Sequence, residues 1–304
     1  MSKQALYILG ILATILLGAL LYPKLCCQDC NMENTENTAP VSIDKSLTAN
    51  YIPFNLSGID FKYNCSDNFR FLKNTFNNIQ PVNDSINNGI SLLKKYFRKN
   101  SKEKLLITGF ALNSEKNTSA FPNLGLARAN NIKNYFVSKG FAADRFETKG
   151  ELRDAWKTSH DTILGAVNFE IRHYDNINTS NTEDWNALKE KINADPLILY
   201  FSPNETEINL SVEERQKIAD LVHYLDNISY AKISCIGHTD GSGDRNVNIQ
   251  LGQDRADFAK EYLIQNGIAE NKIESSSKGP DEPVADNVTV EGKAKNRRTV
   301  VTLK

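Results

Sequence analysis

Hydrophobic and polar positions in this chain of 304 residues follow two periods that predict strands and helices in turn. In residues 231–238, Ile233 and Cys235 share one face while polar residues fall on the other, and this period of two predicts a strand. Residues 241–244 (Gly-Ser-Gly-Asp) predict a loop, because glycine tolerates backbone angles that other residues avoid. Residues at helical spacing then predict a helix that stops at Gly267. They are Arg255, Ala256, Ala259, Tyr262 and Leu263.

Two opposite charges flank the predicted loop. Asp240 follows the end of the strand, and Arg255 comes early in the predicted helix. Strand–loop–helix geometry can bring such a pair to one rim of a pocket, where it would suit a zwitterion that carries an amine and a carboxylate. The same pair could instead form an internal salt bridge that supports the loop, and both interpretations stay open on these residues alone.

Residues 51–175 repeat this arrangement. Residues 104–110 predict a strand like the one that ends at His238, and residues 124–129 (Leu-Gly-Leu-Ala-Arg-Ala) resemble residues 251–256 (Leu-Gly-Gln-Asp-Arg-Ala). A helical stripe precedes each of the two strands, and the later stripe opens with a capping box. The chain is therefore predicted to contain two copies of one fold. The stripes are Ile86, Ile90, Leu93 and Phe97, then Ile218, Leu221, Val222 and Leu225, and the box is Ser211 with Glu214.

The first copy differs from the second where the acid would lie. Leu112 stands at the position of Asp240, and Phe121 stands at the position of Asn248. The arginine is retained as Arg128. An arginine without its acid partner would hold a carboxylate but not the amine beside it. We therefore expect the first copy to be a structural or protein-contacting module.

An uncharged apolar run occupies residues 5–22, at the short end of what spans a bilayer as a helix. A tyrosine near each end of the run is typical of the membrane interface. We expect an uncleaved anchor within residues 1–25, with the rest of the chain exported. A cleaved secretory signal is the alternative, because Lys3 precedes the run. The polar, asparagine-rich residues 26–50 are expected to form a linker.

Charge and the inventory of reactive side chains exclude several classes of function. The formal net charge is −1 and no basic run is present, which argues against nucleic acid as a partner. No nucleophile–base pair or metal-ligand set stands at a recognisable spacing, so we expect no catalytic residues, no cofactor and no metal site. Asp240 and Asp244 flank glycines as in a calcium loop, but the later acidic ligand of such a loop is missing.

The five cysteines, an odd number, do not form a disulfide framework. Cys235 is expected to be a small core residue of the predicted strand. Cys26, Cys27 and Cys30 crowd together after the apolar run; they could form interchain disulfides, and they make no zinc site alone. His238 has no nucleophile or metal partner nearby in the sequence, and we expect it to hold the loop by hydrogen bonds.

Several ordered motifs between residues 195 and 304 resemble a known family. They are residues 237–240 (Gly-His-Thr-Asp) with Asn248, Leu251, Arg255 and Ala256, residues 197–201 (Leu-Ile-Leu-Tyr-Phe) with Asn204, residues 283–287 (Pro-Val-Ala-Asp-Asn), and residues 291–298 (Glu-Gly-Lys-Ala-Lys-Asn-Arg-Arg). Together they resemble the OmpA-like domain, the periplasmic peptidoglycan-binding module at the C-terminus of outer-membrane protein A.

The resemblance implies an α+β fold. With the internal repeat, it implies two tandem OmpA-like β-α-β-α-β-β domains after one N-terminal transmembrane helix, the first of them degenerate. The expected parts are an anchor or signal segment (1–25), a polar linker (26–50), a degenerate OmpA-like domain (51–175), a second linker (176–194) and an OmpA-like peptidoglycan-binding domain (195–304).

The resemblance also implies a role for each candidate site residue. Asp240 would pair with the amine of a diaminopimelate residue in the peptide stem of peptidoglycan, and Arg255 with its carboxylate. Thr239 and Asn248 would add neutral hydrogen bonds, and Arg297 would close the rim. Such a site would select a zwitterionic head group over simple acids or amines.

Two further residues of the motifs have weaker or different roles. Asn204 is the weaker candidate for the site, because Ser202 replaces the aspartate usual in that motif. Leu251 is expected to pack the helix onto the sheet rather than to touch a ligand.

The implied function is that of a non-catalytic, membrane-anchored periplasmic protein that binds peptidoglycan in the envelope of a Gram-negative-type bacterium. The expected location is the inner membrane, with the domains in the periplasm. The alternative is the outer membrane, or secretion after cleavage. A scaffold or secretion-system component, in which the domain at residues 51–175 binds a protein partner, is the alternative for its function. A homo-oligomer is compatible with either function.

Overall fold

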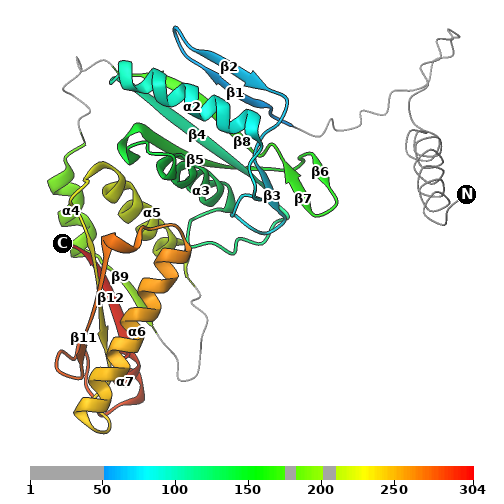
Figure 1. The fold of residues 1–304 in the computed structure, drawn as a ribbon. Coiled ribbons are helices and arrows are strands. Elements are labelled where there is room, and N and C mark those ends of the chain that lie inside the picture. Colours follow the sequence, from blue (N-terminus) through cyan, green and yellow to red (C-terminus); the bar gives the residue numbers. More distant parts are fainter. Residues whose placement is uncertain (1–50, 175–182, 201–209) are drawn as a thin grey trace, which may run out of the picture. The chain divides into compact units, whose positions relative to one another are not determined.

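The computed structural model describes residues 51–174, 183–200 and 210–304 (Figure 1). All three stretches belong to one compact unit, Leu47–Lys304. The anchor expected at residues 5–22 and the linker expected at residues 26–50, with its three cysteines, lie outside the described residues. Within the described stretches, no helix combines the length and the apolar character needed to cross a membrane.

The second lobe, from residue 183 onward, is built on a four-stranded mixed sheet with the strand order β11-β10-β12-β9. β10 (Ile233–His238) runs parallel to β11 (Ile273–Gly279) and antiparallel to β12 (Arg298–Leu303), and β12 pairs antiparallel with β9 (Leu197–Tyr200). The strand predicted within residues 231–238 is therefore confirmed as the interior strand β10.

The sequence predicted the ends of the two long helices of the second lobe with different success. α5 (Val212–Asn227) begins at the predicted capping box, in which Ser211 and Glu214 satisfy each other's backbone N–H groups. α6 (Arg245–Gln265) stops at the predicted place, since Gly267 follows it at φ +93°. Its start was predicted too late. The other helices of this lobe are α4 (Trp185–Ala194) and α7 (Val290–Asn296).

The early start of α6 changes the place of Arg255 on it. The helix begins at Arg245, with Asp244 as N-cap accepting from the N–H groups of Asn246 and Val247. Arg255 therefore lies in the middle of α6, not in its first turns. Leu251, expected to pack against the sheet, is 41% exposed.

Small residues make the contact between α6 and β10. A Cβ on Gly237 would lie 1.8 Å from the carbonyl oxygen of Gly252, a distance that no real Cβ contact shows. Ala256, one turn further along α6, is fully buried. The glycines let the helix approach the strand closely and so set the position of every side chain that α6 directs toward the strand end.

The first lobe, residues 51–174, is built around β4 (Glu103–Leu112). β4 lies between the parallel β5 (Phe146–Arg153) and the antiparallel β8 (Val167–His173). The helices of this lobe are α2 (Asp84–Lys99) and α3 (Leu124–Ser138). Additional short strands were not predicted from the sequence. They are β1 (Phe54–Ser57), β2 (Lys62–Cys65), β3 (Arg70–Leu72), β6 (Thr158–Ser159) and β7 (Thr162–Leu164).

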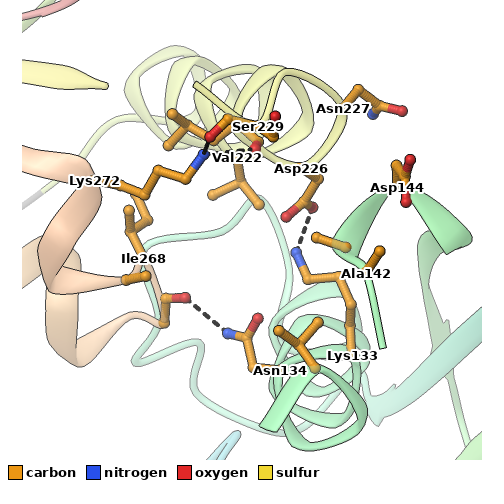
Figure 2. A pocket seen from close by; sticks show the side chains of 15 residues that line it. Lys133, Asn134, Ala142, Asp144, Val222, Asp226, Asn227, Ser229, Ile268 and Lys272 are labelled. Carbon is orange, nitrogen blue, oxygen red and sulfur yellow. Dashed lines mark hydrogen bonds and ion pairs between the residues drawn. The ribbon is translucent and has the colours of Figure 1, made fainter. Parts of the chain in front are cut away.

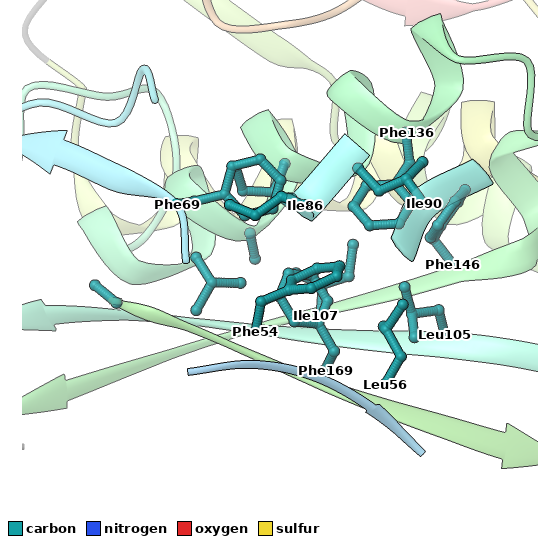
Figure 3. Close-up of a cluster of buried hydrophobic side chains, with 14 of the residues drawn as sticks. Phe54, Leu56, Phe69, Ile86, Ile90, Leu105, Ile107, Phe136, Phe146 and Phe169 are labelled. Atoms are coloured by element: carbon teal, nitrogen blue, oxygen red, sulfur yellow. The ribbon is translucent and has the colours of Figure 1, made fainter. Parts of the chain in front are cut away.

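An aromatic core fills the first lobe (Figure 3). Phe54 meets Phe169 edge-on at 5.0 Å between ring centroids, and Phe136 meets Phe146 at 5.6 Å. Pairs of this geometry add about 0.5–1.5 kcal/mol each beyond the burial of their surface. The predicted stripe of α2 contributes four of the buried side chains, as expected. The first lobe thus carries a substantial hydrophobic core of its own.

The loop between β4 and α3 reaches a second cluster of buried side chains. Ala120 and Phe121 belong to the cluster that includes residues of α5, β10 and α6. The backbone N–H of Ala120 also donates to Oδ1 of Asn266, at 2.7 Å. Phe121 is therefore a packing residue, and the position that aligns with Asn248 contributes to this second cluster.

Both lobes place an interior strand between a parallel and an antiparallel neighbour, with a helix after that strand. In the first lobe, a Cβ on Gly109 of β4 would lie 2.1 Å from the carbonyl oxygen of Gly125 on α3. This approach has the same form as that of Gly237 to Gly252. The presence of two copies of one fold stays a prediction, for which this correspondence is a physical argument.

Candidate functional site

An ion pair joins two of the predicted site residues beyond the end of β10. Nη1 of Arg297, at the C-cap of α7, lies 3.0 Å from Oδ2 of Asp240. The side chains are 19% and 16% exposed, respectively. Burial disfavours the charged carboxylate, but the N–H of Ser242 and the Arg297 guanidinium outweigh it and lower the pKa of Asp240 below its usual value. Asp240 is therefore an anionic group at neutral pH.

Arg255 approaches the same strand end from α6. Its Nη1 donates to the backbone carbonyl of His238 at 3.0 Å. Burial and then the charge of Arg297 lower its pKa, while Asp240 acts in the opposite direction. The guanidinium stays charged at neutral pH because its ordinary pKa is so high. Arg255, Arg297 and Asp240 thus form one cluster with two positive charges and one negative charge.

Thr239 and Asn248 lie beside this charged cluster and make different contacts. Thr239 is buried and its N–H donates to the carbonyl of Gly279, at 2.9 Å. Asn248 is also buried, and its Nδ2 donates to the carbonyl of Ser242, at 2.8 Å. Asn248 therefore supports the loop that carries Asp240. Whether its amide also meets a ligand stays a prediction, and Asn204 lies outside the described residues.

Buried polar atoms without a hydrogen-bond partner among the described residues gather at this strand end. The atoms concerned are Nδ1 of His238, Oγ1 of Thr239, Nε of Arg297 and Oγ1 of Thr299. Such atoms each cost free energy when they are left unpaired, so most native structures pair them. A polar partner from outside the described residues could satisfy these four atoms.

His238 was expected to hold the loop by hydrogen bonds. Its backbone carbonyl accepts from Nη1 of Arg255, whereas Nδ1 of its ring has no hydrogen-bond partner among the described residues. A role of the ring in holding the loop stays a prediction. Burial, followed by the nearby charge of Arg298, lowers the pKa of His238 to about 4. The imidazole is therefore neutral at neutral pH and presents dipolar rather than charged groups to the site.

Two asparagines that sequence reasoning did not assign hold the loop of Asp240 in place. Oδ1 of Asn287 accepts from the N–H of Gly241 at 2.9 Å and from Nδ2 of Asn296 at 2.9 Å. Oδ1 of the fully buried Asn296 accepts in turn from the N–H groups of Val284 and Ala285. Both asparagines stand in the quoted motifs at residues 283–287 and 291–298, which was the signal available for them.

A separate cavity of about 400 Å³ lies away from this cluster and includes none of the predicted site residues (Figure 2). Lys133 and Asp226 form an ion pair in its wall. Nζ of Lys272 donates to the carbonyl of Ser229 at 2.6 Å, and Asn134 donates to the carbonyl of Gly267. Lys133, Asp226 and Lys272 thus already bind protein partners, so this cavity is the weaker candidate for a polar ligand.

No group of three or more His, Cys, Asp or Glu side chains is placed to hold a metal ion within the stretches that the structure describes. Asp244, which could have joined Asp240 in a calcium loop, caps α6 with its carboxylate instead. Cys235 is fully buried as expected, and burial raises the pKa of its thiol to about 12. This thiol is an inert core group at neutral pH.

Comparison with known proteins connects this geometry to a family. Residues 200–297, which span β10, α6, β11 and α7 with the cluster at the end of β10, match the family described as the OmpA family. Residues 200–297 form an OmpA-family domain. The OmpA-family domain thus contains every candidate site residue named above, from Asn204 to Arg297.

The OmpA-family domain also resembles individual curated proteins. Probable lipoprotein YiaD of Escherichia coli is 42% identical over 71 residues, 23% of this chain and 32% of that protein. Peptidoglycan-associated lipoprotein of Buchnera aphidicola is 36% identical over 103 residues, 34% of this chain and 58% of that protein. The chain thus spans about a third to three fifths of the length of these relatives.

A crystal structure of the peptidoglycan-associated lipoprotein from Burkholderia pseudomallei is similar with a TM-score of 0.32 and 25% sequence identity. The similarity covers 35% of this chain and 89% of that one.

Proposed function

We propose that the second lobe binds peptidoglycan non-covalently, without catalysis, at the cluster of Asp240, Arg255 and Arg297. The observation that carries this proposal is the half-buried ion pair of Asp240 and Arg297, with Arg255 bound to the same strand end, beside buried polar atoms that have no partner among the described residues. A carboxylate would pair with the guanidinium groups, and an amine on the same ligand would meet Asp240. A diaminopimelate residue of a peptide stem carries both groups.

The family and one relative's name support the same ligand. The domain belongs to the OmpA family, and a relative is named for its association with peptidoglycan. Three further predictions are part of the proposal: Thr239 Oγ1 hydrogen-bonds the ligand, Asn248 and Asn204 contribute neutral contacts, and Arg297 releases part of its contact with Asp240 when a ligand enters.

The place of the protein follows from the ligand. Peptidoglycan lies in the cell envelope, so the second lobe acts there, and an anchor within residues 1–25 would hold the chain to the inner membrane. One site built on a few charged hydrogen bonds binds weakly, so attachment to a membrane or self-association would raise the effective affinity. The first lobe would serve as a structural module between anchor and binding domain.

Co-sedimentation with purified peptidoglycan sacculi tests the proposal. The compact unit Leu47–Lys304 should sediment with sacculi, whereas the variant with Asp240→Ala and Arg255→Ala should stay in the supernatant. The control variant carries Lys232→Ala and Glu274→Ala, which remove an exposed ion pair of the same sheet, and it should sediment like the wild type. Circular dichroism checks that all three proteins are folded.

Free diaminopimelate should compete for the wild type, while free lysine, which has only one zwitterionic head group, should compete less. Sedimentation of the Asp240 and Arg255 double variant at the wild-type level would show that the ligand binds elsewhere. Absence of binding by the wild type would favour the alternative, a scaffold whose first lobe holds a protein partner.

A further inference from the structure

Arg128 in the first lobe holds the position that Arg255 holds in the second. Arg128 donates from Nη1 to the carbonyl of Phe110 at 2.9 Å, and Arg255 donates from Nη1 to the carbonyl of His238 at 3.0 Å. Each carbonyl belongs to the residue after the glycine that contacts the next helix, Gly109 or Gly237. The two guanidinium groups therefore bind corresponding strand ends.

In the first lobe, the arginine also binds a carboxylate of the same lobe. Nη1 and Nη2 of Arg128 donate to Oε2 and Oε1 of Glu115, at 2.9 and 2.6 Å. Both side chains are 0% exposed. Bidentate pairs of this kind are the strong form of the charge-assisted hydrogen bond. Arg128 in addition stacks over the ring of Phe71, 5.0 Å from its centroid, and Nε donates to the carbonyl of Thr75.

The Glu115 carboxylate receives two further donors from the backbone. The N–H of Leu112 donates to Oε2 at 2.8 Å, and the N–H of Asn74 donates to Oε1 at 2.9 Å. Four donors around one carboxylate, two from a guanidinium fork and two from amides, make a complete carboxylate-binding site. Leu112 is the residue at the position of Asp240, so this site lies where the second lobe places its charged cluster.

We propose that Glu115 is an internal ligand: it occupies, from within the chain, a carboxylate-binding site that the first lobe retains around Arg128. The comparison of this site with Arg255 rests on the proposed function, but the assignment of Glu115 does not. It corrects the expectation that Arg128, having lost its acid partner, would be available to an external carboxylate. The first lobe supplies that carboxylate itself.

The aligned loop position of the second lobe is a glycine. Glu115 stands six residues after Gly109, and Gly243 stands six residues after Gly237. Gly243 has φ +89°, and a Cβ added to it would meet nothing within 4 Å. The loop of the second lobe therefore supplies no carboxylate from the position aligned with Glu115. The two lobes differ at this position, which carries a carboxylate in the first lobe and no side chain in the second.

Rescue by small carboxylates tests this inference in the full chain. In Glu115→Ala, the site around Arg128 should accept formate or acetate from solution. Its unfolding temperature at neutral pH should rise with sodium formate or acetate and level off, beyond the effect of sodium chloride at equal ionic strength. The wild type should respond equally to the three salts, and any binding at Arg255 is present in both proteins and cancels in the comparison.

Two further variants separate a binding site from a simple structural ion pair. Glu170→Ala removes an exposed carboxylate that pairs with Arg172 in the same lobe, and it should show no preference for carboxylate salts. The double variant with Glu115→Leu and Arg128→Met removes both buried charges, and it should lose the preference. Persistence of the preference in the double variant would place the binding elsewhere and overturn the inference.

Equal unfolding temperatures of Glu115→Ala in all three salts would also overturn the inference. If Glu115→Ala does not fold in chloride, refolding yield becomes the measurement. Recovery in formate but not in chloride supports the internal ligand, and no recovery in either salt, with a folded Glu115→Leu and Arg128→Met double variant, contradicts it. None of these measurements contains peptidoglycan, so a failure here is distinct from a failure of sacculus binding.

Discussion

His238 makes the stability of the second lobe depend on pH. The ring is buried and lies near Arg298, and both effects hold its pKa at about 4. An unfolded histidine titrates near 6.5. Between these two values the unfolded chain binds a proton that the folded chain does not bind. The contribution of His238 to stability is therefore complete above about pH 6.5 and is lost as the pH falls toward 4.

His238→Asn should remove this dependence. The difference in unfolding free energy between wild type and variant should shrink by about 1–3 kcal/mol as the pH falls from 6.5 to 4, since each pKa unit is worth about 1.4 kcal/mol. Urea unfolding at several pH values measures it. His160→Asn, at an exposed position, is the matched control and should keep the wild-type slope. A constant difference between wild type and His238→Asn would show that the ring does not titrate as argued.

The partners of single residues were the part that the sequence could not predict. Asp240 and Arg297 are 57 positions apart, and no local pattern connects them. Glu115 lies in a loop without periodicity, so nothing in the sequence marked it as the acid that binds Arg128. Residue identities at the strand end were predictable from motif spacing, whereas pairings across the fold depend on tertiary geometry.

At the scale of elements, the sequence predicted most where one face is buried. The α2 stripe and the β10 alternation were recognised because their buried faces repeat at one period. The first turns of α6 were missed for the opposite reason. Val247 and Leu251 are exposed there, and Gly252 makes the contact with β10, so no apolar stripe marks the start of the helix.

Gly237→Ala should separate α6 from β10. The added Cβ would lie 1.8 Å from the carbonyl oxygen of Gly252, and backbone cannot give way as a side chain can. We expect a loss of about 1–3 kcal/mol or more in unfolding free energy, as for other overpacked sites. Sacculus binding should fall as well, because Arg255 moves with the helix. Chemical denaturation and co-sedimentation measure the two effects.

Gly243→Ala is the control at the same loop. Gly243 has φ +89°, so the alanine would be strained by about 1 kcal/mol. The added Cβ would meet no atom within 4 Å. It should therefore lose some stability and keep its binding. If Gly237→Ala binds sacculi like the wild type, the position of α6 does not matter for the site.

At the scale of the whole molecule, the buried clusters join regions that are far apart in the sequence. Phe121 comes from the loop before α3, yet it packs with residues of α5 and β10. The sequence predicted two copies of one fold, but it gave no sign that this loop contributes to a second core. Hydrophobic periodicity reports burial and does not report against which element a side chain is buried.

Phe121→Ala should weaken the chain beyond its own loop. Removal of a buried phenylalanine costs about 3–5 kcal/mol. Because its neighbours include α5 and β10, probes in the second lobe should report earlier unfolding too. Hydrogen exchange of the β10 amides, compared between wild type and variant, checks this. Leu72→Ala, at a half-exposed position of the first lobe, should leave these amides unchanged. Unchanged β10 exchange in Phe121→Ala would mean that the clusters unfold independently.

The four donors around Glu115 have a consequence for competition. A carboxylate tethered to its site by a loop is present at an effective concentration of the order of millimolar or higher. A dissolved acid of equal intrinsic affinity and lower concentration therefore does not displace it from Arg128. The first lobe is in this sense permanently saturated, so titration of this protein with wall fragments should reach one equivalent per chain and stop there.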